Sequence, residues 1–158
     1  MIIMDISEFH KFREVILTSP PVIGQDLSLL FLYWVIASLP WILGFHFIPF
    51  DSVDAFYPQS RFVVNSFRQG DWPWWNPYQF SGVPVFGDPQ GMIFSLHTIA
   101  GVFLGPYYTL YAFDLVTLLY PLMGGIAIYG LGCTRGVPRA WLLAAALVFM
   151  LGGVATSR

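Results

Sequence analysis

The sequence predicts an all-α integral membrane protein with about three transmembrane helices and a polar outer loop. Hydrophobic residues make up 56% of the 158 residues and charged residues only 10%, whereas soluble domains are about 25% charged. The mean hydropathy is +0.65. Long apolar runs flank one polar, tryptophan-rich segment, a pattern typical of a membrane protein where it meets water at the bilayer surface. The net charge of −2 and the lack of a basic cluster favour no nucleic-acid partner.

The chain opens with a mixed segment followed by the first long apolar run. Residues 1–26 form a mixed, cytoplasmic N-terminal segment. Within it the apolar residues Ile6, Phe9, Phe12 and Ile16 keep roughly helical spacing, which predicts a short amphipathic helix lying on the membrane and ended by Ser19-Pro20-Pro21. Residues 27–50 contain no Asp, Glu, Lys or Arg, and about 20 helical residues cross a hydrocarbon core. This run is therefore the first predicted span. Pro40 should kink it, and we interpret His46 as an interfacial hydrogen-bonding group.

Two further spans are predicted after the polar loop. They cover residues 107–131 and 140–156, and the outer loop covers 51–106. Within the loop, residues 91–105 are apolar but short, so they favour a re-entrant, interfacial or buried segment. Asp114 is the only charged residue of the second span. An ionised group there usually faces a cavity or a partner, which makes Asp114 a candidate functional residue.

The distribution of basic residues predicts the orientation. Four of them flank the first two spans on one side: Lys11, Arg13, Arg135 and Arg139. By the positive-inside rule this side is cytoplasmic, so the N-terminus is cytoplasmic and the loop 51–106 extracytoplasmic. Arg61 and Arg68 in the loop oppose this assignment mildly, and they are easier to accept if they hold an anion.

The number of spans predicts that the chain is the beginning of a longer protein. The third predicted span has no later helix to pair with, although its Gly152-Gly153 pair would suit close packing. We therefore interpret residues 27–158 as the N-terminal part of a larger transmembrane domain. A small complete subunit is the alternative.

Two carboxylates follow the first apolar run directly. In a helix, Asp51 and Asp54 would fall on the same face because they are three residues apart. Two aspartates at a low-dielectric edge can bind a divalent cation, or one of them can act as a general base. The alternative is that both acids only cap the next helix, whose N-terminal end favours anions. The residue types leave the two interpretations open.

An amphipathic helix is predicted over residues 56–69, ended by Gly70 at the C′ position. Arg61 and Arg68 lie on its polar face. Guanidinium groups match phosphate oxygens, so these residues are candidates for binding a phosphate or pyrophosphate. The alternative is that both arginines contact lipid headgroups, with the helix lying along the outer leaflet.

Aromatic and amide side chains follow this helix between two prolines. Trp75 suits either a bilayer interface or the apolar face of a sugar ring. Asn76 and Gln79 could then bind the hydroxyl edge of the sugar. Asp88 and Gln90 belong to a predicted turn, where Asp bonds its own backbone. We count all five among the candidate substrate-binding residues, and Asp88 has a purely turn-forming role as its alternative.

The loop resembles that of the YfhO-type bacterial membrane proteins. The stretch D-S-V-D-A-F-Y-P is followed by F-R-Q-G-D-W-P-W-W-N-P-Y-Q-F-S-G-V-P-V-F-G-D-P-Q. The family pattern reads approximately R-x-G-x-x-P-x-W-N-P-x-x-x-x-G-x-P-x-x-x-D-P-Q after an aspartate and Tyr-x-Pro. The positions in register are Arg68, Gly70, Pro73, Trp75, Asn76, Pro77, Gly82, Pro84, Asp88, Pro89 and Gln90.

The resemblance implies a multi-span glycosyltransferase of the GT-C class. Such enzymes move a sugar from a polyprenyl-phosphate carrier to a cell-envelope polymer or lipid acceptor on the outer face of the plasma membrane. The resemblance also implies that an aspartate at the start of the loop is the base, or the residue that holds a divalent cation such as Mg²⁺ or Mn²⁺. Asp51 matches that position best and Asp54 is the second candidate. At Asp114 the relatives tend to have a neutral amide. The competing hypothesis is a non-catalytic membrane scaffold or transport component capped by an interfacial Trp/Pro loop.

Overall fold

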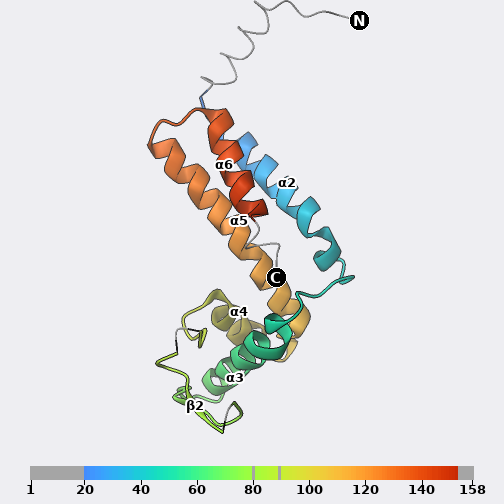
Figure 1. The fold of residues 1–158 in the computed structure, drawn as a ribbon, viewed down its shortest axis with the longest axis vertical. Coiled ribbons are helices and arrows are strands. Elements are labelled where there is room, and N and C mark those ends of the chain that lie inside the picture. Colours follow the sequence, from blue (N-terminus) through green and yellow to red (C-terminus); the bar gives the residue numbers. More distant parts are fainter. Residues whose placement is uncertain (1–19, 80, 89, 153–158) are drawn as a thin grey trace, which may run out of the picture. The chain divides into compact units, whose positions relative to one another are not determined.

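The computed structural model describes residues 20–79, 81–88 and 90–152, which are mostly helical (Figure 1). The elements in order are α2 (Ile23–Ile42), the π-helix η1 (Ser52–Phe56), α3 (Tyr57–Arg68), β1 (Trp75–Asn76), β2 (Val83–Pro84), α4 (Leu96–Leu104), the 3₁₀-helix η2 (Gly105–Tyr107), α5 (Leu110–Thr134) and α6 (Arg139–Leu151). They form two compact units. The helical unit contains the described residues up to 39 and from 120 onward, and the loop unit contains residues 40–119.

The predicted helical class is confirmed, with two candidate membrane-spanning helices. By length and composition, α2 and α5 could each cross a membrane. In the described part of the chain α6 has 13 residues, and residues 153–156 of the third predicted span lie outside the described residues. The amphipathic helix predicted near the N-terminus also lies outside the described residues.

Helices α2 and α5 differ in extent from the first two predicted spans. Helix α2 begins at Ile23 instead of residue 27 and ends at Ile42 instead of residue 50. It ends early because Gly44 adopts the left-handed region, with φ of 74°. The backbone N–H of Phe45 then donates to the Pro40 carbonyl and that of Gly44 to the Trp41 carbonyl, both at 2.9 Å, which is a Schellman motif. Helix α5 is likewise displaced, because it begins at Leu110 and ends at Thr134.

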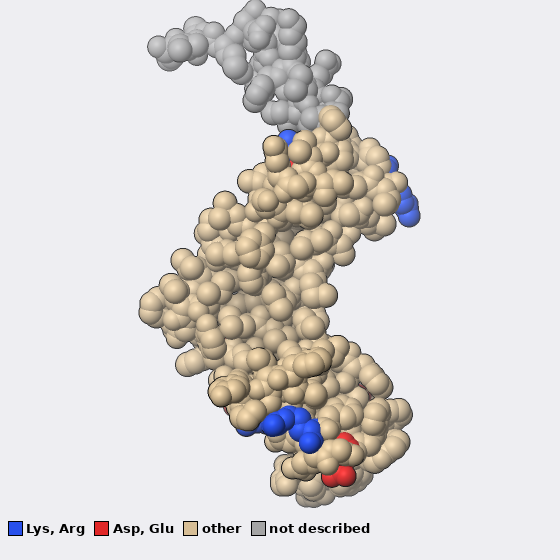
Figure 2. Space-filling view, turned by 180° about the vertical axis from the view of Figure 1, so that it is seen from behind, with Lys and Arg blue, Asp and Glu red and all other residues tan. Residues whose placement is uncertain are grey.

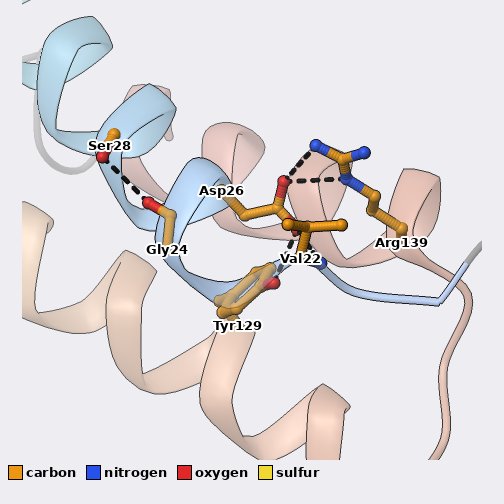
Figure 3. Close-up of polar contacts among 6 residues, drawn as sticks. All are labelled: Val22, Gly24, Asp26, Ser28, Tyr129 and Arg139. Carbon is orange, nitrogen blue, oxygen red and sulfur yellow. Dashed lines mark hydrogen bonds and ion pairs between the residues drawn. The ribbon is translucent and has the colours of Figure 1, made fainter.

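The helical unit is held by a buried carboxylate that the sequence interpretation had placed outside the helices. Asp26 lies in the first turn of α2 and is fully buried. Its Oδ1 accepts from Arg139 at the start of α6, at 2.6 Å from Nη2 and 2.8 Å from Nε. Its Oδ2 accepts from the Tyr129 hydroxyl of α5 at 2.7 Å and from the Val22 N–H at 3.1 Å (Figure 3). One side chain therefore joins three helices.

The loop unit is built on the packing of α3 against α4. Gly101 of α4 is buried, and a Cβ there would overlap the Val64 side chain of α3 and lie 3.1 Å from the Tyr108 ring. Val64, Tyr108 and Phe113 form one buried cluster. The predicted end of α3 at Gly70 is confirmed: its φ is 82°, and Asp71 N–H donates back to the Ser66 carbonyl at 2.9 Å.

A short β-ladder departs from the predicted all-α fold. Strands β1 and β2 pair antiparallel, with Trp75 opposite Pro84 and Asn76 opposite Val83. Gly82 allows this hairpin because its φ is 113°, and a Cβ there would lie 2.5 Å from the Trp75 indole. Residues 83–84 thus form a strand because the preceding tryptophan segment offers a partner.

Candidate functional site

The two predicted catalytic carboxylates are exposed at the start of the loop unit. Asp51 precedes the π-helix η1 and Asp54 lies within it. Among the described residues neither carboxylate makes a hydrogen bond or ion pair, and Asp51 provides no side-chain cap. The expected shared face assumed α-helical spacing. In a π-helix the hydrogen bonds run from i to i+5, so residues three apart diverge further around the axis.

The two arginines of the loop unit have different environments. Figure 2 shows basic atoms on the surface of this unit, in which Arg61 and Arg68 are the only Lys or Arg residues. Nη1 of Arg61 donates to the Tyr57 hydroxyl at 3.3 Å and to the Tyr108 carbonyl. The Arg68 guanidinium lies over Gly105, where a Cβ would be 3.2 Å from its Cζ. Arg68 is exposed and makes no hydrogen bond or ion pair within the described chain, so it is the arginine available to an anion.

The predicted amide pair is used within the hairpin. Asn76 is buried at 2% exposure, and its Oδ1 accepts from the Tyr78 N–H at 2.9 Å. Its Nδ2 donates to Oε1 of Gln79 at 3.4 Å. Trp75 is 55% exposed and lies against Gly82. The ring is thus accessible to a ligand, whereas the Asn76 amide shapes the turn.

Asp88 forms the predicted turn. Its Oδ1 accepts from the Gln90 N–H at 2.8 Å, and its Oδ2 accepts from Nε2 of Gln59 on α3 at 3.2 Å. Asp88 therefore ties the tryptophan-rich loop to the helix. Gln90 itself is exposed and contributes its backbone N–H.

A pocket of about 450 Å³ opens beside this turn. Its described lining comprises Phe86, Gly87, Asp88, Met92, Ile93, Phe94 and Ser95. Ser95 also caps α4 by accepting from the Thr98 N–H at 3.3 Å. Of the predicted site residues, Asp88 is the one in this lining. The predicted set is therefore distributed over the loop unit, with the exposed aspartates and Arg68 outside the pocket lining.

Gly91 packs closely against the backbone of Val85 and Asp88, and its replacement provides a stability prediction. A Cβ at Gly91 would lie 2.6 Å from the Val85 carbonyl oxygen and 2.9 Å from that of Asp88, both backbone atoms. We expect Gly91→Ala to destabilise the loop unit by about 1–3 kcal/mol, because backbone must move. Gly87→Ala is the matched control, since its Cβ would meet nothing within 4 Å. Thermal unfolding of both variants checks this, and equal midpoints would contradict it.

Asp114, near the start of α5, is a buried polar side chain of the loop unit. Asp114 is 2% exposed, and its Oδ2 accepts from the Ile48 N–H at 3.2 Å. Its Oδ1 has no hydrogen-bond partner among the described residues. The sequence singled out Asp114 by its place in an apolar run. It gave no sign of the contact with a segment 66 residues earlier.

His97 was missed because its surroundings are apolar in sequence. It is 3% exposed, stacks on Phe113 with ring centroids 4.2 Å apart, and its Nε2 lies 3.3 Å from the Thr117 hydroxyl. Burial lowers the pKa of its imidazole from 6.5 to about 4. His97 is therefore a neutral packing residue of α4 at physiological pH.

The fold and site together define a class of protein. It is a helical chain with two helices long and apolar enough to cross a membrane, and its polar aromatic loop folds as a compact unit. Within the described ranges, no three His, Cys, Asp or Glu side chains gather as metal ligands would. Comparison of the chain with protein-family models, curated proteins and solved structures gave no match.

Proposed function

We propose that the chain belongs to a membrane glycosyltransferase of the GT-C class. The enzyme would transfer a sugar from a polyprenyl-phosphate carrier to a cell-envelope polymer or lipid acceptor on the outer face of the plasma membrane. The single observation that carries this proposal is the chemistry left available in the loop unit. Asp51, Asp54 and Arg68 are exposed and have no partner in the described chain. The two candidate spans and the resemblance of the loop to YfhO-type proteins support it further.

The mechanism proposed is inverting transfer. The Asp51 carboxylate takes the proton of the acceptor hydroxyl, whose oxygen forms a bond to the anomeric carbon of the sugar. The bond from that carbon to the carrier phosphate breaks, and the polyprenyl phosphate leaves with the electron pair. The guanidinium of Arg68 stabilises the charge on the leaving phosphate. Arg61 is less suited, because Tyr57 and Tyr108 already hold it.

The exposed carboxylates also fit a divalent cation. Mg²⁺ and Mn²⁺ prefer carboxylate oxygens, often two of them with water completing the shell. Because Asp51 and Asp54 diverge around η1, a single one of them would hold such an ion, with water in the remaining positions. When bound, the ion would supply positive charge at the carrier phosphate.

One observation favours the non-catalytic alternative, a membrane scaffold or transport component. Several polar residues predicted to bind substrate instead hold the loop in shape: Arg61, Asn76, Gln79 and Asp88. A loop built for rigidity could serve as a cap. The two proposals differ in what they require of Asp51.

Replacement of Asp51 separates them. We expect Asp51→Asn in the full encoded protein to reduce sugar transfer by about 10²–10⁴-fold, because the general base is lost while the side-chain shape is kept. The assay uses membranes supplied with radiolabelled polyprenyl-phosphate sugars and measures label in envelope polymer and lipid. Asp71→Asn is the control, since the Asp71 side chain is also exposed and has no partner within the described chain. Unchanged transfer by Asp51→Asn would refute the catalytic role.

A further inference from the structure

Three exposed aromatic rings meet on the surface of the loop unit. Trp72, Trp74 and Phe86 are 41%, 62% and 52% exposed. Their ring centroids lie 5.3 Å apart for Trp74 and Phe86, 5.9 Å for the two tryptophans, and 6.2 Å for Trp72 and Phe86. The rings are tilted by 48–53° to one another. They form a faceted aromatic surface, which Phe67 supports by an edge contact with Trp72 at 5.2 Å.

Phe86 connects this aromatic surface to the pocket. It lines the pocket of about 450 Å³ together with Asp88, Ser95 and the 82% exposed ring of Phe94. The lining is about equally polar and apolar, and a concavity of a few hundred Å³ that combines apolar walls with placed polar groups can hold a small ligand. Each Asp88 oxygen accepts one hydrogen bond from the described residues, and a carboxylate oxygen has two acceptor positions. Asp88 can therefore shape the turn and still accept from ligand hydroxyls.

The charge of residues 71–90 indicates which kind of ligand the aromatic surface suits. Residues 71–90 contain Asp71 and Asp88 and no Lys or Arg. Segments that lie on anionic bilayers are rich in Lys and Arg on their polar face, so this surface is poorly suited to an anionic lipid. Flat aromatic rings beside a carboxylate acceptor instead suit the apolar faces and the hydroxyl donors of a saccharide.

We propose that Trp72, Trp74, Phe86 and Asp88 form a binding site for a neutral oligosaccharide, with sugar rings lying on the aromatic surface and one sugar reaching the pocket. The identification of this saccharide as the acceptor rests on the proposed glycosyl transfer. The site is separate from the carboxylates proposed for chemistry, so binding and transfer can be tested independently.

The test uses the full chain in detergent micelles and a panel of neutral oligosaccharides of glucose, galactose, mannose and N-acetylglucosamine. Tryptophan fluorescence and calorimetry measure binding. We expect saturable binding to at least one member, weakened about tenfold by Phe86→Ala and about tenfold by Asp88→Asn, which keeps a side-chain oxygen for the turn. The control is Phe103→Ala, because Phe103 is 87% exposed in the same unit and belongs to neither the aromatic surface nor the pocket lining.

Three results would overturn the proposal. They are no saturable binding to any panel member, an equal loss in Phe86→Ala and Phe103→Ala, or burial of the rings in lipid. The third result is tested in nanodiscs whose lipid headgroups carry spin labels, which quench tryptophan fluorescence. The Trp74→Phe variant identifies the part of the fluorescence that comes from Trp74. If the labels quench this part and no oligosaccharide relieves the quenching, the rings lie in the bilayer. Asp51→Asn distinguishes a failure of this proposal from a failure of the proposed function, because it should reduce transfer as stated above and leave oligosaccharide binding unchanged.

Discussion

Replacement of Arg139 by leucine is expected to destabilise the helical unit by about 3–5 kcal/mol. The substitution leaves the fully buried Asp26 carboxylate without its cation and without the two bonds from Nη2 and Nε. The Tyr129 hydroxyl and the Val22 N–H remain as donors, but hydrogen bonds alone do not neutralise a buried charge. Denaturant unfolding of the chain in detergent micelles, followed by circular dichroism, measures the loss.

Two further variants identify the cause of the loss. Arg135→Leu removes a neighbouring exposed arginine that makes no ion pair in the described chain, so its stability should stay within about 0.5 kcal/mol of the parent. The double variant Asp26→Leu with Arg139→Leu removes both charges, and it should regain most of the stability because no uncompensated charge is left. A double variant as unstable as Arg139→Leu would show that the arginine acts through packing alone.

The helix ends that the sequence predicts well are those set by local chemistry. Gly70 was recognised as the residue that ends α3, and its left-handed φ confirms this. Gly44 has the same role after α2, yet the uninterrupted apolar run concealed it. Hydropathy continues to residue 50 although the backbone hydrogen bonds of the helix stop at a glycine. Composition therefore predicts which segment is apolar, and glycine conformation decides where its helix ends.

Long-range polar contacts were beyond the sequence interpretation. Asp26 and Arg139 are 113 positions apart. The sequence placed Asp26 in the N-terminal segment 1–26 and Arg139 among the basic residues of the cytoplasmic side, with no sign that the two would pair. Ser60 and Tyr108, 48 positions apart, share a buried hydrogen bond of 2.7 Å. Periodicity and turn chemistry describe neighbours in the chain. Pairing across helices depends on packing, which no local pattern encodes.

The candidate site shows the same division between local and long-range information. Residue types correctly indicated a turn at Asp88, because an Asx-turn needs only the next two residues. They did not indicate that Gln59 would hold the second oxygen of Asp88, or that Phe86 would join the tryptophans. The aromatic surface beside the pocket thus emerges from contacts between α3 and the loop, and from ring packing within the loop.

Acidification is expected to destabilise the loop unit through His97. Its folded-state pKa of about 4 lies below the ordinary 6.5, so the unfolded chain binds the proton more readily. The stabilising contribution is therefore complete above pH 6.5 and is lost as the pH falls from 6.5 towards 4. The difference corresponds to about 3 kcal/mol by pH 4. Unfolding free energies measured between pH 7.5 and 4 check this loss.

The contribution of His97 must be separated from that of carboxylates that titrate in the same range. His97→Gln keeps a hydrogen-bonding group near Thr117 and removes the imidazole, so the stability of this variant should fall less steeply with acidification than that of the parent. His46→Gln is the matched control, because it removes an exposed histidine of the same unit. If the parent and His97→Gln lost stability in parallel from pH 6.5 to 4, the imidazole would not be the group responsible. A difference confined to this interval would instead assign the acid sensitivity to the buried ring stacked on Phe113.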